Sequence, residues 1–343
     1  MPNLLLVGPL PPPLGGATIS FKLLVDEFEN HENYDFLLFN IKSGLSLLKE
    51  LEQLLKLLRL AKGARVILIH SNSRRISIWT PALVLFSKLT SKQIQFRFFG
   101  SDLNTIYQKN VLNRLRLSLL KYADTVLLET KGLVSFYEKN ISQNNAFWFP
   151  NSRILITHKT ELPGGYDRRL QLVYTGHVKV EKGIRVLLDT MENLNAYTDI
   201  SLKVVGSCED ESLKLKMECL PNVEYLGEMP QGKVGQILKS SDIFVFPSFW
   251  EGEGYSGSVI EAMMYGLPVI TTDWRFLGEL VIDDYNGILV PINNSKALSL
   301  AIIKLFEDRR LLSTYSSNSR ITSRVYDAKY WNGKRYFELI PKH

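Results

Sequence analysis

The sequence predicts an α/β protein with two domains, each built on a parallel, doubly wound sheet. Three observations predict this fold class. Short apolar segments of strand length alternate with longer helical segments along the chain, which is typical of β-α-β units. A polar, glycine-containing stretch at 158–168 interrupts the alternation once. The chain has 343 residues, enough for two domains of roughly 100–200 residues each.

The first half of the chain contains short buried strands separated by helices. The helix at 46–62 is rich in leucine and carries several basic residues. The polar stretch at 158–168 then reads as a linker. The expected strands are 4–7, 35–39, 66–69, 94–99, 125–129 and 146–149, and the expected helices are 17–28, 46–62, 77–89, 112–122 and 131–139.

The second half repeats the same pattern. Its expected strands are 172–174, 202–205, 223–225, 243–246, 269–271 and 287–290. Its expected helices are one from 184, one at 234–240, one ending near 265, and those at 296–308 and 311–315. Two such domains are expected to face each other across a cleft at the carboxyl ends of both sheets, where such sheets bind ligands.

The positive charge lies in the first half of the chain. Residues 1–155 carry 19 Lys and Arg against 11 Asp and Glu, whereas the remainder carries 22 against 24. A basic domain favours an anionic substrate or an anionic membrane surface as partner, although a merely solvated surface would look the same. The basic residues are scattered and no recognised nucleic-acid motif is present, so we expect no nucleic-acid partner.

Two cysteines, Cys208 and Cys219, are too few for a disulfide framework and predict free thiols in a reducing compartment. The N-terminus lacks the pattern of a signal peptide. Uncharged stretches near 3–21 and 76–87 are broken by prolines or are shorter than the ~20 residues that span a bilayer. We therefore expect a cytoplasmic protein, peripheral on the inner face of the membrane.

The most informative segment is 247–263, PSFWEGEGYSGSVIEAM, which follows an apolar strand and enters a helix. The backbone amides of a glycine-rich loop and the positive end of a helix dipole suit a phosphate. The segment also holds two carboxylates, Glu253 and Glu261. Carboxylates do not bind phosphate, but they accept hydrogen bonds from sugar hydroxyls. A phosphate cradle beside hydroxyl acceptors predicts a sugar-nucleotide site.

Other segments after strands add candidate ligand contacts. Gly15 and Gly16 precede a helix and permit close approach of a ligand, although a simple turn would use glycine equally well. Lys182, in the segment YTGHVKVEKG, is placed to neutralise a diphosphate. His70 ends a strand and Asp102 follows Phe99-Gly100-Ser101; a core position for His70 and a helix cap for Asp102 are the alternatives. No Asp-x-Asp motif is present, so we expect no metal.

Together these residues resemble glycosyltransferase family four, the retaining transferases of the GT-B fold. The resemblance covers nearly the whole chain and is most specific at 247–268, where the Glu pair, Glu-Ala-Met and Gly-x-Pro-Val-Ile occur in family order. It implies that the aromatic tail at 326–337 crosses back to the first domain. The domains would then be 1–158 with helix 326–343 on the acceptor side, and 159–325 for the nucleotide sugar.

The resemblance also implies residue roles. Glu253 would contact the donor sugar near the reacting carbon, and His70 and Asp102 would complete the catalytic set. The donor would be bound by Lys182 at the diphosphate, by Glu261 at the ribose, by the loop amides, and by residues of both domains: Gly15, Gly16, His177, Lys182, Gly254, Tyr255, Ser256, Gly257, Ser258 and Glu261.

The chain departs from the family pattern at three places. His177 stands where a phosphate-binding Arg is usual, and His177, Lys179 or Arg185 would replace it only in part. Phe99 stands where a His is usual, which leaves the catalytic assignment on that side open. Gly254-Tyr255-Ser256 replaces Gly-Phe-Gly.

The implied activity is retaining, metal-independent transfer of a sugar from a UDP- or GDP-sugar, with UDP favoured, to a hydroxyl of a glycan or lipid-linked acceptor in cell-surface polysaccharide synthesis. No cofactor is expected beyond the donor. Two alternatives remain open: a sugar-nucleotide epimerase of the same fold, and a non-catalytic sugar-nucleotide-binding partner of a transferase.

Overall fold

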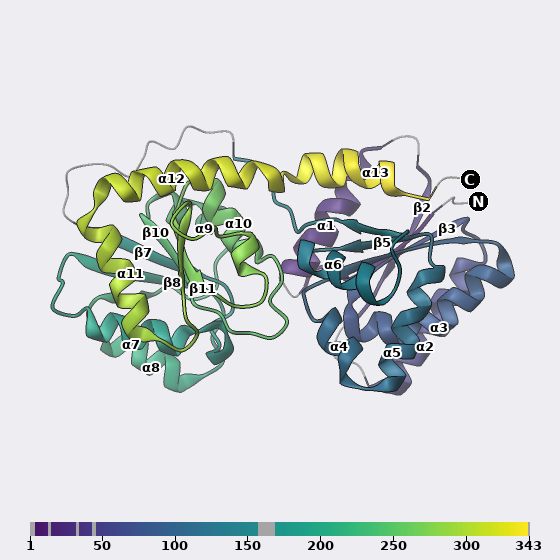
Figure 1. Cartoon of the computed structure of the whole chain (residues 1–343), viewed down its shortest axis with the longest axis horizontal. Helices are drawn as coiled ribbons and strands as arrows, with labels where there is room; N and C mark the ends of the chain where they lie inside the picture. Colours follow the sequence, from purple (N-terminus) through teal and green to yellow (C-terminus); the bar gives the residue numbers. More distant parts are fainter. Residues whose placement is uncertain (1–3, 13–14, 32–33, 43–45, 157–168, 342–343) are drawn as a thin grey trace. The chain divides into compact units, whose positions relative to one another are not determined.

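The computed structural model describes residues 4–12, 15–31, 34–42, 46–156 and 169–341. The chain forms two compact units, one of residues 1–153 with 328–343 and the other of residues 154–327. Each unit is a parallel six-stranded sheet with helices packed on it, as the alternation of strands and helices predicts (Figure 1). No helix among the described residues combines the length and apolarity needed to cross a membrane.

The first unit has the strand order β2-β1-β3-β4-β5-β6, and all its ladders are parallel. Its strands are β1 (Leu4–Gly8), β2 (Phe36–Asn40), β3 (Val66–Asn72), β4 (Gln93–Phe99), β5 (Thr125–Leu128) and β6 (Ala146–Trp148). Its helices are α1 (Gly16–Glu29), α2 (Leu47–Ala61), α3 (Ser73–Thr90), α4 (Leu103–Lys109), α5 (Val111–Ser118), η1 (Leu119–Tyr122), α6 (Lys131–Asn140), η5 (Lys329–Arg335) and α13 (Tyr336–Leu339).

The second unit has the strand order β12-β11-β10-β7-β8-β9 and is also fully parallel. Its strands are β7 (Leu170–Thr175), β8 (Ile200–Val205), β9 (Val223–Tyr225), β10 (Ile243–Phe246), β11 (Val269–Thr272) and β12 (Gly287–Val290). Its helices are η2 (Val180–Lys182), α7 (Ile184–Asn193), α8 (Glu211–Cys219), α9 (Gln231–Lys239), α10 (Gly257–Met264), η3 (Leu277–Glu279), α11 (Ser295–Glu307), α12 (Arg309–Ser323) and η4 (Arg324–Tyr326).

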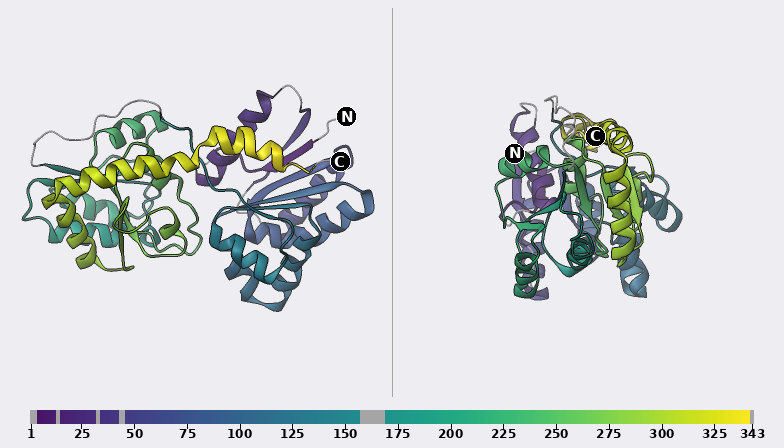
Figure 2. Two further views of the ribbon diagram at one scale, coloured as in Figure 1. Left: turned by 45° about the horizontal axis from the view of Figure 1, so that its top comes forward. Right: turned by 90° about the vertical axis from the view of Figure 1, so that its left-hand side faces the viewer.

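The end of the chain completes the core of the first unit. Trp331, Tyr336 and Leu339 are buried in one cluster with Phe21 and Phe28 of α1. Backbone carbonyls fix the segment, since Gln95 donates to Leu339 O at 2.8 Å and the amide of Ala328 donates to Arg153 O at 2.8 Å. Figure 2 shows this C-terminal ribbon beside α1. The aromatic residues of the tail therefore fill part of the hydrophobic core of the first unit.

Some helices differ from the sequence expectation. Helix α3 begins at Ser73 rather than at 77, because the side chain of Asn72 accepts a hydrogen bond from the amide of Arg75 at 3.0 Å. Helix α8 is absent from the sequence expectation; the side chain of Asp210 caps it by accepting hydrogen bonds from the amides of Ser212 and Leu213. Helix α12 continues to Ser323, far beyond 315. Its serine-rich end is stabilised by packing, since Ser319 donates to Asn286 O at 3.0 Å.

Candidate functional site

Two loops of the second unit meet where β7 and β10 end. Gly183 has φ of 77°, and a Cβ there would lie 1.9 Å from the carbonyl oxygen of Pro247. The amide of Phe249 donates to Glu181 O at 2.9 Å. Only glycine allows this left-handed backbone and this close approach at position 183. The contact joins the segment that carries Lys182 to the segment that carries Glu253.

Lys182 and Glu253 form an ion pair across these loops, in which the carboxylate is buried and the lysine is partly exposed. The distance from Lys182 Nζ to Glu253 Oε2 is 2.8 Å, and Glu253 is only 4% exposed. The same carboxylate oxygen accepts a hydrogen bond from the hydroxyl of Ser248, which is fully buried. The sequence placed both charged residues in a donor site. Their direct contact with each other, and the contribution of Ser248, come from the structure.

Aromatic side chains surround the ammonium group. Lys182 Nζ lies 4.1 Å from the ring centre of Trp250 and 5.7 Å from that of Phe246. The carbonyl of Trp250 accepts a hydrogen bond from the indole of Trp274 at 2.9 Å. These contacts hold the cation in place, because its position over the ring faces is electrostatically favourable. The sequence alone assigns no role to Ser248 or Trp250, although both lie in the segment at 247–263, five and three positions before Glu253.

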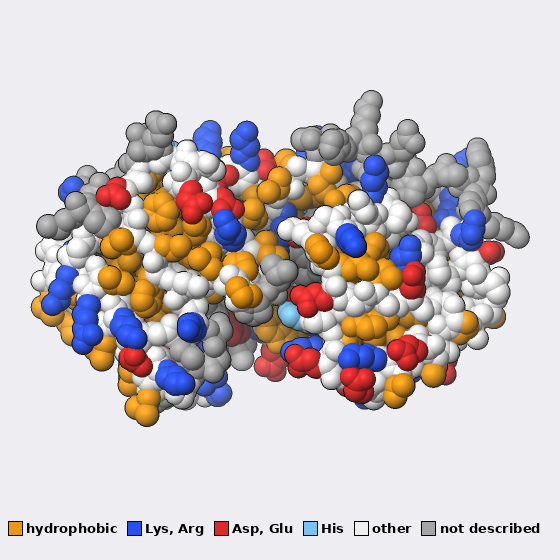
Figure 3. Space-filling view, turned by 180° about the vertical axis from the view of Figure 1, so that it is seen from behind, with side chains coloured by type: hydrophobic (Ala, Val, Ile, Leu, Met, Phe, Trp, Pro, Cys, Tyr) orange, Lys and Arg blue, Asp and Glu red, His pale blue; other side chains and the backbone are white. Residues whose placement is uncertain are grey.

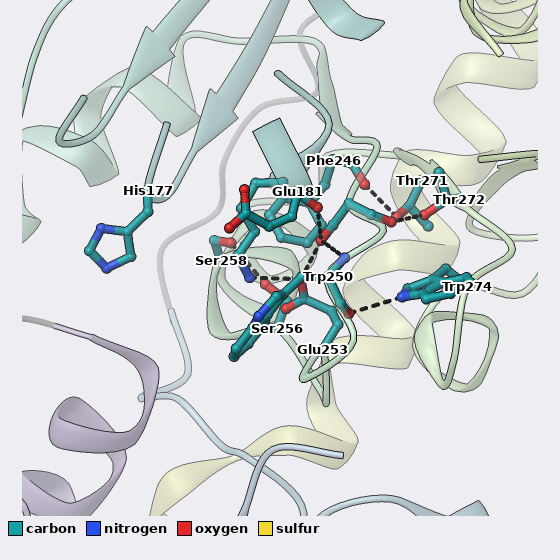
Figure 4. A network of polar contacts seen from close by, with 12 residues as sticks. His177, Glu181, Phe246, Trp250, Glu253, Ser256, Ser258, Thr271, Thr272 and Trp274 are labelled. Carbon is teal, nitrogen blue, oxygen red and sulfur yellow. Dashed lines mark hydrogen bonds and ion pairs between the residues drawn. The ribbon is translucent and has the colours of Figure 1, made fainter. Parts of the chain in front are cut away.

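The loop continues into helix α10, whose first residue is Gly257. The hydroxyls of Ser256 and Ser258 lie 3.0 Å apart, and the side chain of Ser256 makes no capping bond. First-turn amides of a helix have no intrahelical acceptor, so this end suits an anion. Figure 4 shows the polar network around Glu253, Ser256 and Ser258. The end of α10 and the Lys182–Glu253 pair thus belong to one loop system.

The other predicted residues of this unit lie at different depths. Glu261 is half-buried in the second turn of α10. Desolvation of the Tyr265 hydroxyl, with a smaller effect from the charge of Glu261, raises the pKa of Tyr265. Gly254 is buried in the loop. The Tyr255 side chain is 1% exposed, donates to the carboxylate of Glu279 and packs edge-on against Tyr326. It supports the core, so only its backbone is available to a ligand.

His177 stands apart from this network in Figure 4. Its Nδ1 lies 3.0 Å from the hydroxyl of Ser207, and partial desolvation of the ring together with the charges of Lys179 and Lys182 lowers its pKa. A lowered pKa favours the neutral ring, which is a weaker partner for phosphate than the Arg that is usual there.

In the first unit, Gly15 caps helix α1 and Gly16 begins it. The amide of Gly15 donates to Thr18 Oγ1 at 3.0 Å, and no described atom lies within 4 Å of a Cβ built on Gly16. Packing among the described residues therefore does not require glycine at 16. Asp102 precedes α4 but makes no side-chain capping bond, and its buried Oδ1 has no hydrogen-bond partner among the described residues.

His70 lies in the core of the first unit. It is fully buried, its Nε2 is 2.7 Å from the hydroxyl of Tyr336, and its ring contacts those of Phe21 and Phe99. Burial, with a smaller effect from Arg97, holds its pKa well below the usual range. The catalytic role expected for His70 stays a prediction, and a side chain enclosed in this way is not open to solvent. The reason is the C-terminal segment, which brings Tyr336 onto the end of β3.

No group of three or more His, Cys, Asp or Glu side chains is arranged as metal ligands within the described part of the chain. Both cysteines there are unpaired, Cys208 partly exposed and Cys219 exposed.

Comparison with known protein families finds a match within the second unit. Residues 163–322 match the family described as glycosyl transferases group 1. An uncharacterized glycosyltransferase of Methanocaldococcus jannaschii is 32% identical over 160 residues, 45% of this chain and 41% of its own length. A phosphatidyl-myo-inositol mannosyltransferase of Mycobacterium leprae is 24% identical over 268 residues, 75% of this chain and 67% of its own length. The chain thus spans less than half of the first of these relatives.

Solved structures share the whole architecture. Sucrose-phosphate synthase from Thermosynechococcus elongatus superposes with a TM-score of 0.77 at 18% identity, covering 99% of this chain and 98% of its own. Anabaena HepE in complex with UDP-glucose superposes with a TM-score of 0.76 at 16% identity, covering 99% of each chain. The two parallel units are therefore those of the GT-B fold, as the resemblance predicted.

Proposed function

We propose that this chain is a retaining glycosyltransferase that moves a hexose from a nucleoside-diphosphate sugar, with UDP favoured, to a hydroxyl of a glycan or lipid-linked acceptor. The observation that carries the proposal is the Lys182–Glu253 ion pair beside the N-terminal end of α10. The matched family and relatives support sugar transfer. A further relative, from Campylobacter jejuni, is named as an N-acetylgalactosaminyltransferase acting on a diphospho-undecaprenol-linked sugar, which supports a lipid-linked acceptor.

The proposed chemistry follows from the charges at this site. When the bond between sugar and diphosphate breaks, negative charge develops on the leaving phosphate and positive charge on the sugar. Lys182 and the first-turn amides of α10 would stabilise the leaving group without a metal. Glu253 would accept hydrogen bonds from sugar hydroxyls, and Glu261 from the ribose. Gly15, Gly16 and Asp102 are assigned to the site by the resemblance alone.

Donor binding tests the assignment. We expect UDP to raise the melting temperature of the full chain, because a ligand at about 100 times its Kd stabilises by about 2.7 kcal/mol. Lys182→Met should abolish most of that shift. A second test variant is Glu253→Gln, which removes the charge that pairs with Lys182. Its matched control is Glu251→Gln, because Glu251 is exposed and Lys182 pairs with Glu253 instead. Equal shifts in the wild type and in Lys182→Met would contradict the site.

Turnover tests the reaction. With a UDP-hexose and an undecaprenyl-diphosphate-linked sugar, Lys182→Met and Glu253→Gln should each lower kcat on the order of 10²–10³-fold. Glu251→Gln should turn over like the wild type. The configuration of the product at its new anomeric carbon, read by NMR, tests retention. Consumption of the donor with no transferred sugar would favour the epimerase, and donor binding without any turnover would favour the non-catalytic partner.

A further inference from the structure

Helix α2 exposes leucines on a face where water would favour polar side chains. Leu54 and Leu57 are buried against the first unit. Leu48, Leu51 and Leu55 point away from it, with exposures of 80%, 43% and 56%. Residues three and four positions apart lie on one side of a helix. These three leucines therefore form a continuous apolar stripe on the outer side of α2.

The exposed apolar surface continues over two neighbouring helices. Helix α3 packs against both α2 and α5, and the three helices lie side by side in Figure 1. Leu85 and Leu89 of α3 are 60% and 76% exposed. On α5, the exposed apolar residues are Val111 (67%), Leu112 (54%) and Leu115 (63%). Scattered apolar residues need no explanation, but a grouping over adjacent helices marks an interaction surface.

The same segment concentrates the positive charge of the protein. Residues 46–122 contain 14 Lys and Arg and 3 Asp and Glu, whereas the rest of the chain contains 27 and 32. Two of the three acidic residues are already paired, Glu50 with Arg75 and Glu52 with Lys56. Lys49, Arg59 and Lys88 are exposed beside the leucines. Figure 3 shows blue and orange side chains interspersed over the first unit, on the left of that view.

We propose that the outer faces of α2, α3 and α5 dock the protein on an anionic lipid bilayer. The leucines would enter the boundary between headgroups and acyl chains, while the Lys and Arg side chains contact lipid phosphates. The combination favours a bilayer over other partners. The centre of a protein interface is depleted of lysine, and a nucleic-acid site has no use for an exposed row of leucines. The proposal is independent of the sugar-transfer reaction.

Vesicle sedimentation of the full chain tests the proposal. We expect binding to vesicles of phosphatidylcholine with phosphatidylglycerol, little binding to phosphatidylcholine alone, and weaker binding at high salt. Lys49→Gln/Arg59→Gln/Lys88→Gln should weaken binding about a hundredfold, since each basic residue near the surface contributes about 1 kcal/mol. Leu48→Gln/Leu55→Gln should weaken it roughly tenfold or more.

Matched variants in the second unit serve as controls. Leu215 and Leu300 are similarly exposed, at 61% and 58%, and Lys233, Lys239 and Lys296 are exposed lysines. Glutamine at these positions should leave vesicle binding unchanged, and circular dichroism checks that every variant is folded. The proposal is overturned if anionic vesicles do not bind, if neutral vesicles bind equally well, or if test and control variants lose binding alike.

Discussion

At the scale of single residues, the charged side chains have partners in the structure that the sequence does not indicate. The sequence groups Glu253 with Glu261, because both lie in one local motif. The fold instead brings Lys182, 71 positions away, to 2.8 Å from Glu253. A buried carboxylate is costly unless it is paired, and Lys182 and Ser248 supply the partners. A donor that binds both side chains must therefore replace the Lys182–Glu253 contact with contacts of its own.

His70 carries a prediction about pH. Its pKa in the folded protein is held well below the usual range by burial, whereas the unfolded chain has the ordinary value of about 6.5. Above that value both states are neutral at His70. As the pH falls below about 6.5, the imidazole of His70 binds a proton in the unfolded state but stays neutral in the folded state. The free energy of unfolding therefore falls by up to about 1.4 kcal/mol per pH unit.

Urea unfolding at several pH values measures this slope. His70→Gln removes the imidazole and should make the loss of stability between about pH 6.5 and 5 shallower than in the wild type. Parallel slopes for the two proteins would contradict the prediction.

At the scale of elements, one glycine holds two loops of the site together. Gly183 and Gly227 both have positive φ, 77° and 68°. A Cβ at 183 would overlap the carbonyl of Pro247, whereas a Cβ at 227 meets no described atom within 4 Å. Substituting alanine at each position in turn therefore distinguishes the cost of backbone strain, present at both, from the cost of steric overlap, present only at 183.

Gly227→Ala should lower the free energy of unfolding by about 1–2 kcal/mol, the cost of left-handed backbone for a residue with a Cβ. Gly183→Ala should lower it by at least about 1–3 kcal/mol more, because the loops must also move apart. Only Gly183→Ala should weaken UDP binding. Chemical denaturation and the UDP thermal shift measure both effects; equal losses in the two variants would show that the loop contact does not matter.

At the scale of the whole molecule, the end of the chain is part of the first unit. Trp331 and Tyr336 lie in its core with residues of β1 and α1, although more than half of the chain separates them in sequence. The tail is thus a structural component, and His70 owes its buried hydrogen bond to it.

A chain ending at Asp327 should lose the cooperative unfolding of the first unit. Each large aromatic side chain removed from a core costs about 3–5 kcal/mol, and a typical domain has only about 5–15 kcal/mol of stability. Limited proteolysis should then cut the first unit while the second resists. A chain ending at Pro341 is the control, and Trp331→Ala should lower the stability of the first unit by about 3–5 kcal/mol even if the shortened chain does not express. Unchanged protection of residues in β1 and α1 would refute this role.

The sequence by itself determined two domains of alternating strands and helices, and the resemblance to a known family added the GT-B fold. The alternation is a local pattern, because apolar periodicity acts within one element, whereas the donor site at 247–263 stays a prediction. The same reasoning missed α8 and the length of α12, where an acidic cap and tertiary packing outweigh weak helix propensity. Only the tertiary structure decided which distant side chains meet. It placed Lys182 against Glu253, enclosed His70 behind Tyr336, and left the leucines of α2 exposed. The physical reason is that burial and pairing depend on the whole fold, which local sequence does not specify.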